Sequence, residues 1–130
     1  MKPVSTKSIG DFGERYAANY LRLHGYWIKE RNYRSGKYEI DIIASTPKDV
    51  VFAEVKTRTY TKESVKNAPP PHLAVHADKQ RYTRLAAQHY LYTHPTKKQP
   101  RMDVIEIWLL KSPDPKKPKV YRIHHIKAAY

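Results

Sequence analysis

EIDIIASTPKDVVFAEVK, residues 39–56, is the stretch that decides the fold of this chain. Polar and apolar residues alternate over 38–44 and again over 50–56, and a period of two is typical of β-strands. Residues 45–49 combine a proline with four polar residues, a length and composition typical of a hairpin loop. The stretch therefore predicts two antiparallel strands, around which the other elements are arranged.

The register of this hairpin determines which charged side chains face each other. If Ala44 pairs with Val51, then Asp41 lies opposite Glu54. Like charges directly opposite each other destabilise a sheet, and burial increases the penalty. We therefore expect either that one of these carboxyl groups is protonated or that a positive group lies between them.

A divalent cation is the natural group to satisfy two such carboxylates. Mg²⁺ takes hard oxygen ligands and often binds only one or two carboxylates together with waters and a substrate phosphate. Lys56 follows Glu54 by two positions and shares its face of the strand, where its ammonium could lower the pKa of a water or hold a phosphate oxygen. This pattern predicts metal-assisted phosphodiester hydrolysis. The same register places Glu39 opposite Lys56, so an ordinary half-buried hairpin with that ion pair is the alternative interpretation.

The spacing D-x12-E-x-K, formed by Asp41, Glu54 and Lys56, resembles the signature of the PD-(D/E)xK, restriction-endonuclease-like nucleases. Its surroundings make the resemblance more specific. The segments GDFGERYAANYLRLHGYWIKERNYR, EIDIIA, VVFAEVKTR and RMDVIEI, with a Lys-led helix before the last, resemble the YraN-like family of bacterial proteins over roughly residues 8–110. The resemblance implies an endonuclease-like fold similar to that of archaeal Holliday-junction resolvases. The family usually has Gly before EID, where this chain has Tyr38.

The resemblance also implies roles for individual residues. Asp41 and Glu54 would bind one or two Mg²⁺ or Mn²⁺ ions, with the Val55 carbonyl completing a site, and Lys56 would position the water or stabilise the pentacovalent phosphorus. Glu14, at the edge of the apolar stripe of the first expected helix, matches the helix carboxylate that joins the metal site in resolvase-like members. A partly exposed glutamate paired with a nearby base is the alternative for Glu14.

Positive charge indicates the partner. Lys and Arg number 25 against 12 Asp and Glu, a formal net charge of +13, which is the electrostatic signature of a protein that binds a phosphate backbone. We expect DNA, branched or single-stranded, as the partner, and solvated surface charge is the alternative. The candidate nucleic-acid contacts are Arg31, Arg34, Lys37, Arg58 and Lys79.

Other classes of protein are disfavoured by what the sequence lacks. The chain has no cysteine, which excludes disulfides and thiolate metal sites. It has no apolar run of signal-peptide or membrane-span length, so we expect no membrane association and a cytoplasmic location. Cutting a junction requires two active sites, which favours a homodimer.

The remaining elements are predicted from the spacing of apolar residues and from residues that cap helices or form turns. We expect one domain, 1–130, with loose ends at 1–7 and 127–130 and a long loop at 59–77. Helices are expected from Ser8 to His24 and from an Asp78 cap to about Tyr92, and further strands over 26–33, 101–110 and 120–126. We also expect Arg101 and Asp103 to form a structural ion pair or hydrogen-bond anchor.

These elements predict an α/β fold with a restriction-endonuclease-like core, in which helices flank a mixed central sheet in the order α-β-β-β-α-β-β. The first three strands can form a meander, and the helical crossover to the fourth requires a parallel neighbour. The leading functional hypothesis is a metal-dependent DNA nuclease, structure-selective or nonspecific because no base-reading motif is evident, in repair, recombination or processing. A non-catalytic nucleic-acid-binding protein that retains the fold is the main alternative, and a structural partner of a larger complex is another.

Overall fold

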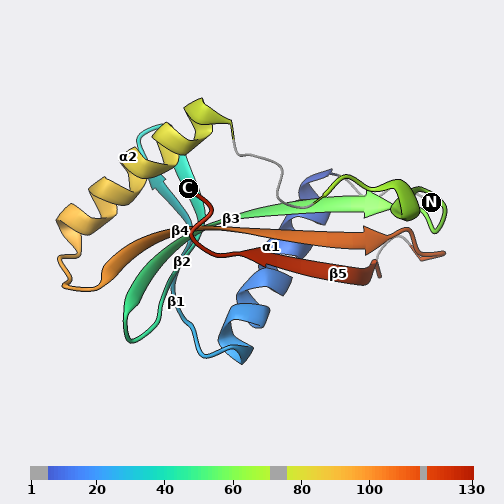
Figure 1. The fold of residues 1–130 in the computed structure, drawn as a ribbon, viewed down its shortest axis with the longest axis horizontal. Coiled ribbons are helices and arrows are strands. Elements are labelled where there is room, and N and C mark those ends of the chain that lie inside the picture. Colours follow the sequence, from blue (N-terminus) through green and yellow to red (C-terminus); the bar gives the residue numbers. More distant parts are fainter. Residues whose placement is uncertain (1–5, 71–75, 115–116) are drawn as a thin grey trace.

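The computed structural model describes residues 6–70, 76–114 and 117–130. In chain order, the elements are α1 (Thr6–Leu23), β1 (Trp27–Ser35), β2 (Tyr38–Ser45), β3 (Asp49–Tyr60), the 3-10 helix η1 (Ser64–Asn67), α2 (Ala77–Thr93), β4 (Gln99–Leu110) and β5 (Lys119–Ile126) (Figure 1). This order of helices and strands is the one expected from the sequence.

The strands form one mixed sheet in the order β1-β2-β3-β4-β5. β1, β2 and β3 pair antiparallel as a meander, β3 and β4 pair parallel, and β5 returns antiparallel to β4. The parallel pair is joined through α2, as a crossover connection requires. The predicted mixed sheet with flanking helices is confirmed.

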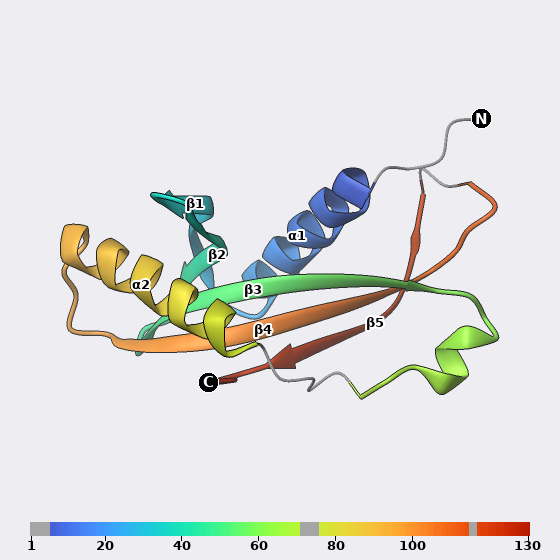
Figure 2. The ribbon, with the colours of Figure 1, turned by 90° about the horizontal axis from the view of Figure 1, so that it is seen from above.

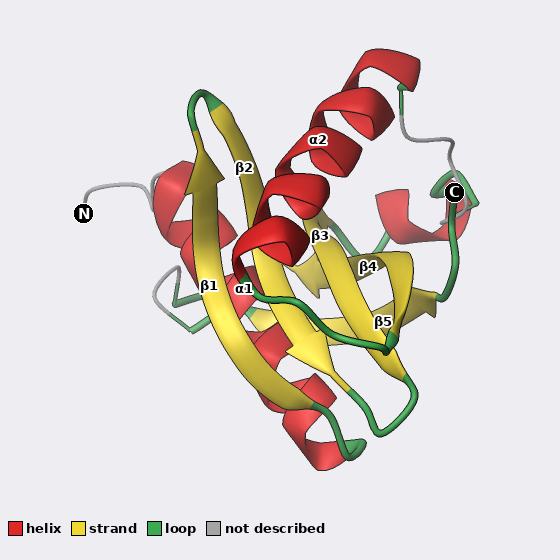
Figure 3. Ribbon diagram, turned by 90° about the vertical axis from the view of Figure 1, so that its left-hand side faces the viewer, coloured by secondary structure: helices red, strands yellow, loops and turns green. Residues whose placement is uncertain are grey.

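The two faces of the sheet are covered by different helices. In Figures 2 and 3, α1 and α2 lie on opposite sides of the sheet. Ala17, Ala18 and Leu21 of α1 are buried with Ile42 and other strand residues in one apolar cluster. On the α2 side, the buried apolar helix residues are Ala86, Ala87 and Tyr90. Packing of the two helix faces against the sheet removes apolar area from water, the main stabilising contribution to folding.

The element boundaries correct several predictions. α1 begins at Thr6, so residues 6 and 7 are helical rather than loose, and residues 1–5 lie outside the described part. α2 is capped by His76, whose Nδ1 accepts a hydrogen bond from the Asp78 backbone N–H at 3.3 Å, so Asp78 belongs to the first turn. The expected loop at 59–77 is shorter, because β3 continues to Tyr60 and η1 interrupts it; residues 71–75 lie outside the described part.

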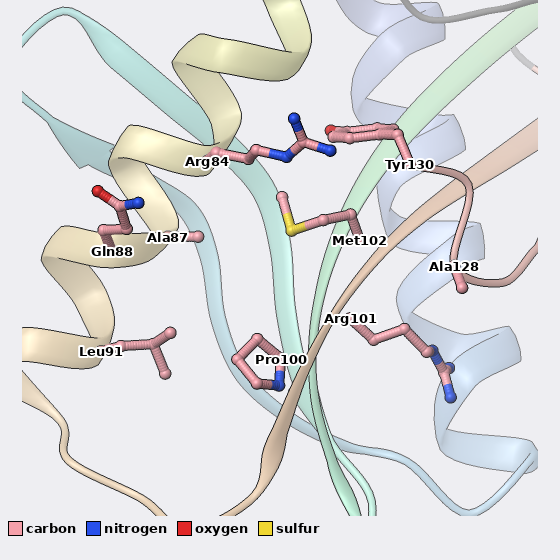
Figure 4. A pocket seen from close by; sticks show the side chains of 9 residues that line it. All are labelled: Arg84, Ala87, Gln88, Leu91, Pro100, Arg101, Met102, Ala128 and Tyr130. Atoms are coloured by element: carbon pink, nitrogen blue, oxygen red, sulfur yellow. The ribbon is translucent and has the colours of Figure 1, made fainter.

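The C-terminal residues are packed, so the prediction of a loose end at 127–130 is wrong. The Ala128 N–H donates to Oδ1 of Asp103 at 3.0 Å, and the Ala129 N–H donates to the Met102 carbonyl at 2.7 Å. The Arg84 guanidinium of α2 lies 5.4 Å from the Tyr130 ring centroid, and both residues line a hollow of ≈ 340 Å³, whose lining side chains are drawn in Figure 4. The tail is therefore held to β4 by backbone hydrogen bonds and to α2 by its last side chain.

Arg101 and Asp103 form the structural anchor that the sequence predicted. Nε and Nη2 of Arg101 donate to the two Asp103 carboxylate oxygens, both at 2.9 Å. Arg101 also donates to Asp49 at 3.0 Å and to the Tyr26 hydroxyl at 2.8 Å, while His125 Nε2 lies 2.7 Å from Asp103. Burial by itself raises the Asp103 pKa, but the hydrogen bonds from His125 and Arg101 bring it below its usual value. This network ties the starts of β3 and β4 to the end of β5.

Candidate functional site

Pairing between β2 and β3 stops partway along both strands. The expected register of Ala44 with Val51 is confirmed, and the last pair of the ladder is Ile42 with Ala53. Beyond that pair β2 continues beside β1 only and β3 beside β4 only, and Figure 1 shows the two strands separating. We call this opening the β2–β3 fork; the first residues beyond the last pair are 41 and 54.

The backbone of β2 turns about its axis at Asp41. Ile40 and Ile42 are two residues apart and would normally share a face, yet they belong to clusters on opposite sides of the sheet. Opposite Asp41 on β1 lies Asn32, which has a φ of 53°, in the left-handed region that asparagine tolerates better than most residues. The turn places the Asp41 carboxylate within the fork, where its Oδ2 accepts a hydrogen bond from the Val55 N–H at 2.8 Å.

The electrostatics of Asp41 reflect this position. Burial raises its pKa, and the charge of Glu54 raises it further. The Val55 N–H and the ammonium of Lys79 oppose the rise, but the net direction is upward. The mutual repulsion of the two carboxylates, inferred from the hairpin register, is therefore present.

Glu54 supplies an oxygen that lacks a hydrogen-bond donor. Its Oε2 is buried and has no hydrogen-bond partner within the described part of the chain. A carboxylate oxygen removed from water without a donor or a cation is costly. This atom is therefore a ready-made ligand position for a cation entering the fork.

Glu14 brings a third carboxylate to the fork, from α1. Its pKa is raised to about 7, mainly by burial and then by the charge of Asp41, while Arg31 lowers it. With its amide nitrogen turned toward the carboxylates, Asn32 donates to Oε2 of Glu14 at 3.0 Å and to Oε1 of Glu39 at 3.2 Å. A carboxyl group whose pKa is near 7 can exchange a proton at neutral pH.

Gly13 explains how α1 approaches so closely. A Cβ at this position would collide with the hydroxyl of Thr57 on β3. Because Gly13 has no side chain, α1 can lie against β3, the strand that carries Glu54. Glu14 is the next residue of the helix, so this contact also brings its carboxylate close to β3. The sequence analysis did not single out Gly13, although a glycine in the interior of a helix is a signal of close packing.

The lysines predicted for the site lie on two different elements. Lys56 is on β3, two residues beyond Glu54, and is partly buried. The charge of Lys79, in the first turn of α2, acts on Asp41.

The alternative pairing of Glu39 with Lys56 is wrong, because Glu39 faces Arg34 on β1 with a nitrogen–oxygen distance of 3.7 Å.

The other predicted nucleic-acid contacts have distinct surroundings. Arg31 acts electrostatically on Glu14, and the Lys37 ammonium lies 5.7 Å from the Tyr38 ring centroid. Arg58 donates a hydrogen bond from Nε to the buried carboxylate of Glu106 at 3.0 Å. The sequence did not indicate a role for Glu106, because this residue lies within a mostly apolar strand segment.

Tyr38, the residue before the EID segment, packs against α2. Its ring stacks on that of Tyr82 with centroids 4.8 Å apart and an interplanar angle of 15°. The ring is thus held by the helix.

The donor set suits a hard cation but is not a closed cage. Across residues 6–70, 76–114 and 117–130, no three His, Cys, Asp or Glu side chains are close enough to form a metal site by themselves. Mg²⁺ commonly uses only one or two carboxylates and keeps several waters. Asp41, the free Oε2 of Glu54 and the Val55 carbonyl would fit that pattern, with Glu14 near enough to act on a bound water.

Neither length nor apolar character would let any of the described helices span a membrane.

Comparison with known proteins places the chain in a family. Residues 13–107 match the model of the uncharacterised protein family UPF0102. A UPF0102 protein of Caldanaerobacter subterraneus subsp. tengcongensis is 39% identical over 131 residues, covering 100% of both chains. Another, from Clostridioides difficile, is 36% identical over 128 residues, covering 98% of this chain and 100% of the relative. A third, from Geobacter metallireducens, is 47% identical over 88 residues, 68% of each chain. The resemblance to the YraN-like proteins is thereby confirmed, and the chain belongs to the UPF0102 family.

Proposed function

We propose that this protein is a metal-dependent nuclease that hydrolyses DNA phosphodiester bonds. Its cleavage would be selective for DNA structure or nonspecific. The observation that carries the proposal is the β2–β3 fork, where Asp41 and Glu54 meet and Oε2 of Glu54 is buried without a donor. A structural hairpin has no need of two facing carboxylates, since they destabilise it. A site that binds a cation and a phosphate does need them.

Each residue at the fork has a distinct role in this proposal. Asp41, Glu54 and the Val55 carbonyl would hold Mg²⁺ or Mn²⁺, which when bound polarises the phosphate and lowers the pKa of its water. The ammonium of Lys56 stabilises negative charge on a phosphate oxygen. The Glu14 carboxylate, with its pKa of about 7, orients the attacking water and accepts its proton.

The charge of the molecule supports DNA as the substrate. A net charge of +13 favours a polyanion, and the cations of Arg31 and Lys79 lie near enough to act on the site carboxylates. Contacts of this kind neutralise phosphates and carry no sequence information. Recognition by the shape of the nucleic acid is therefore the expected mode.

A non-catalytic DNA-binding protein is the second candidate. It is favoured by one observation, that no group of three metal-ligating side chains is assembled within the described residues. In that case the fork carboxylates would be retained from the nuclease fold without a catalytic role, and divalent ions would have no effect on the protein.

The test combines a melting temperature with a cleavage assay. We expect Mn²⁺ to raise the melting temperature of the wild type, because a ligand that binds only the folded state stabilises it. Asp41→Asn should melt at the same temperature as the metal-free wild type or higher, lose the response to Mn²⁺ and cleave no DNA. Lys56→Ala should keep the Mn²⁺ response while losing cleavage.

Asp78→Asn is the matched control, since Asp78 is exposed and its carboxylate pairs with Arg81 at 3.6 Å. It should keep both the Mn²⁺ response and the cleavage activity. A wild type that ignores Mn²⁺, together with a destabilised Asp41→Asn, would rule out the nuclease.

A further inference from the structure

A second hollow lies at the far end of the hairpin from the fork. It has a volume of ≈ 290 Å³ and opens where β2 ends, β3 begins and α2 ends. Ser45 is four residues from Asp41 along β2, about 13 Å at the usual rise of a strand. Between them Ile43 is buried beneath α2, so this hollow is separate from the fork.

The hollow combines apolar surface with one unsatisfied hydroxyl. Val50 and Pro95 contribute apolar surface, and the ring of His94 stacks on Tyr90 with centroids 4.2 Å apart and an interplanar angle of 11°. Ser45 is only 1% exposed, and its Oγ has no hydrogen-bond partner in the part of the chain that the structure describes. A buried hydroxyl without a partner costs stability, which is explained if a ligand supplies the partner.

The rim of the hollow is cationic and carries an exposed aromatic ring. Lys29 and Lys98 line it, and none of its described lining residues is acidic, although the charge of Glu30 acts on Tyr90 through space. The Lys98 ammonium lies 5.5 Å from the ring centroid of Trp27, whose side chain is 57% exposed. Trp27 pairs with Ser45 across β1 and β2, so their side chains lie on the same face of the sheet, and the contact with Lys98 places the ring beside the rim.

The chemistry favours a nucleobase over a bare phosphate inside the hollow. The hollow lies at the C-terminal end of α2, where the helix dipole disfavours an anion. An uncharged base would instead lie against the apolar walls and form a hydrogen bond with Ser45. Lysines on the rim suit the phosphates on either side, and an exposed tryptophan suits stacking by a neighbouring base.

We propose that this hollow binds an unpaired nucleotide of a nucleic-acid strand, with the base inside and its phosphates on Lys29 and Lys98, while Trp27 stacks on the next base. The site would hold a single-stranded arm beside a duplex. The proposal rests on the proposed function only in taking the ligand to be a nucleic acid, and it does not require cleavage.

Binding of fluorescent oligonucleotides, measured by anisotropy with chelator present, tests the site without cleavage. The probes are a 12-nucleotide oligothymidylate, an abasic strand of the same length and a blunt 12-base-pair duplex. Trp27→Ala should weaken binding of the oligothymidylate about tenfold, the effect of losing one stacked base, and change duplex binding less than about twofold. Trp27→Phe should retain most of the affinity, and the wild type should bind the abasic strand more weakly than the oligothymidylate.

Two further variants separate the site from general effects of charge and stability. Lys98→Ala should weaken binding of the oligothymidylate more than Lys111→Ala, the control, which removes an equal charge at the opposite end of β4. Ser45→Ala should lower affinity for the oligothymidylate while leaving the melting temperature unchanged or higher, because it removes a buried unsatisfied hydroxyl.

The proposal is overturned if Trp27→Ala and Lys98→Ala match the Lys111→Ala control, if they weaken duplex binding as much, or if the abasic strand binds as tightly as the oligothymidylate. Loss of affinity in the pocket variants without any Asp41-dependent cleavage would disprove the nuclease and keep the nucleotide site.

Discussion

At the scale of single residues, the fork is shaped by carboxylates whose protons are held more tightly than usual. The Glu14 pKa rises from 4.5 to about 7 through burial and the charge of Asp41, and the Asp41 pKa rises as well, through burial and Glu54. An acid with a raised pKa in the folded state binds more protons folded than unfolded. Its contribution therefore lowers stability as pH rises between the unfolded and the folded pKa.

Glu14→Gln should remove much of this pH dependence. The melting temperature of the metal-free wild type should fall as the pH rises from about 5 to 7, the window between the two Glu14 pKa values. The variant should show a smaller fall, with the part due to Asp41 remaining. Melting curves at half-unit pH intervals measure the difference. Identical slopes in the two proteins would show that Glu14 is a solvated surface side chain.

At the scale of elements, the site depends on how closely α1 lies against β3. Gly13 provides that contact, since any Cβ there meets Thr57, and Glu14 follows it directly. Gly10, one turn earlier in the same helix, has no heavy atom within 4 Å of the position of a Cβ. The two glycines therefore differ in role although both lie in the same helix.

Gly13→Ala should destabilise the protein by about 1–3 kcal/mol, the typical cost of overpacking. Gly10→Ala, its control, should be neutral or stabilising by up to about 1 kcal/mol, because alanine favours a helix more than glycine does. Adding Thr57→Ala should recover part of the loss in Gly13→Ala, and a double-mutant cycle by chemical denaturation measures that coupling. Additive effects of the two changes would mean that helix and strand are not in contact there.

At the scale of the whole molecule, two features act across many elements: the buried Arg101–Asp103 network and the distribution of positive charge. The first joins strands that are far apart in sequence, since Asp103 also contacts His125 and Ala128. The second concerns binding rather than folding. The network is buried and therefore insensitive to salt, whereas the surface charge is exposed and is screened by salt.

Asp103→Asn should destabilise the protein by about 3–5 kcal/mol, because it removes the buried carboxylate that accepts two hydrogen bonds from Arg101 and leaves the Arg101 charge paired with the partly exposed Asp49 instead. Asp78→Asn breaks an exposed pair with Arg81 and should cost at most about 1 kcal/mol. Urea denaturation at neutral pH compares the two. An equal, small effect of both substitutions would contradict a structural role for the network.

Affinity for DNA should fall steeply with salt, since each neutralised phosphate releases a counterion. If Arg31, Arg34, Lys37 and Lys79 each neutralise one phosphate, the slope of log K against log salt is about −3.6, or roughly a 150-fold loss between about 50 and 200 mM salt. Lys79→Ala should reduce the slope by about 0.9. Titrations by anisotropy at four salt concentrations measure it, and a constant affinity would exclude a backbone-binding surface.

The sequence alone determined the features that depend on local pattern. The period-2 runs on either side of residues 45–49 predicted the two strands, and the proline and polar residues between them predicted the hairpin loop. The pairing of Ala44 with Val51 was only assumed from the sequence, and the structure confirms it; the approach of Asp41 to Glu54 follows from that register. The parallel pairing of β3 with β4 followed from the helix between them.

Only the tertiary structure decided how the site is assembled, since its contacts join residues that local periodicity treats as unrelated. The turn of β2 at Asp41, opposite the left-handed Asn32, brings the carboxylate to the Val55 N–H. The helix carboxylate of Glu14 reaches the fork only because Gly13 has no side chain to keep α1 away from β3. These features depend on how the separate elements pack, which no single stretch of sequence encodes.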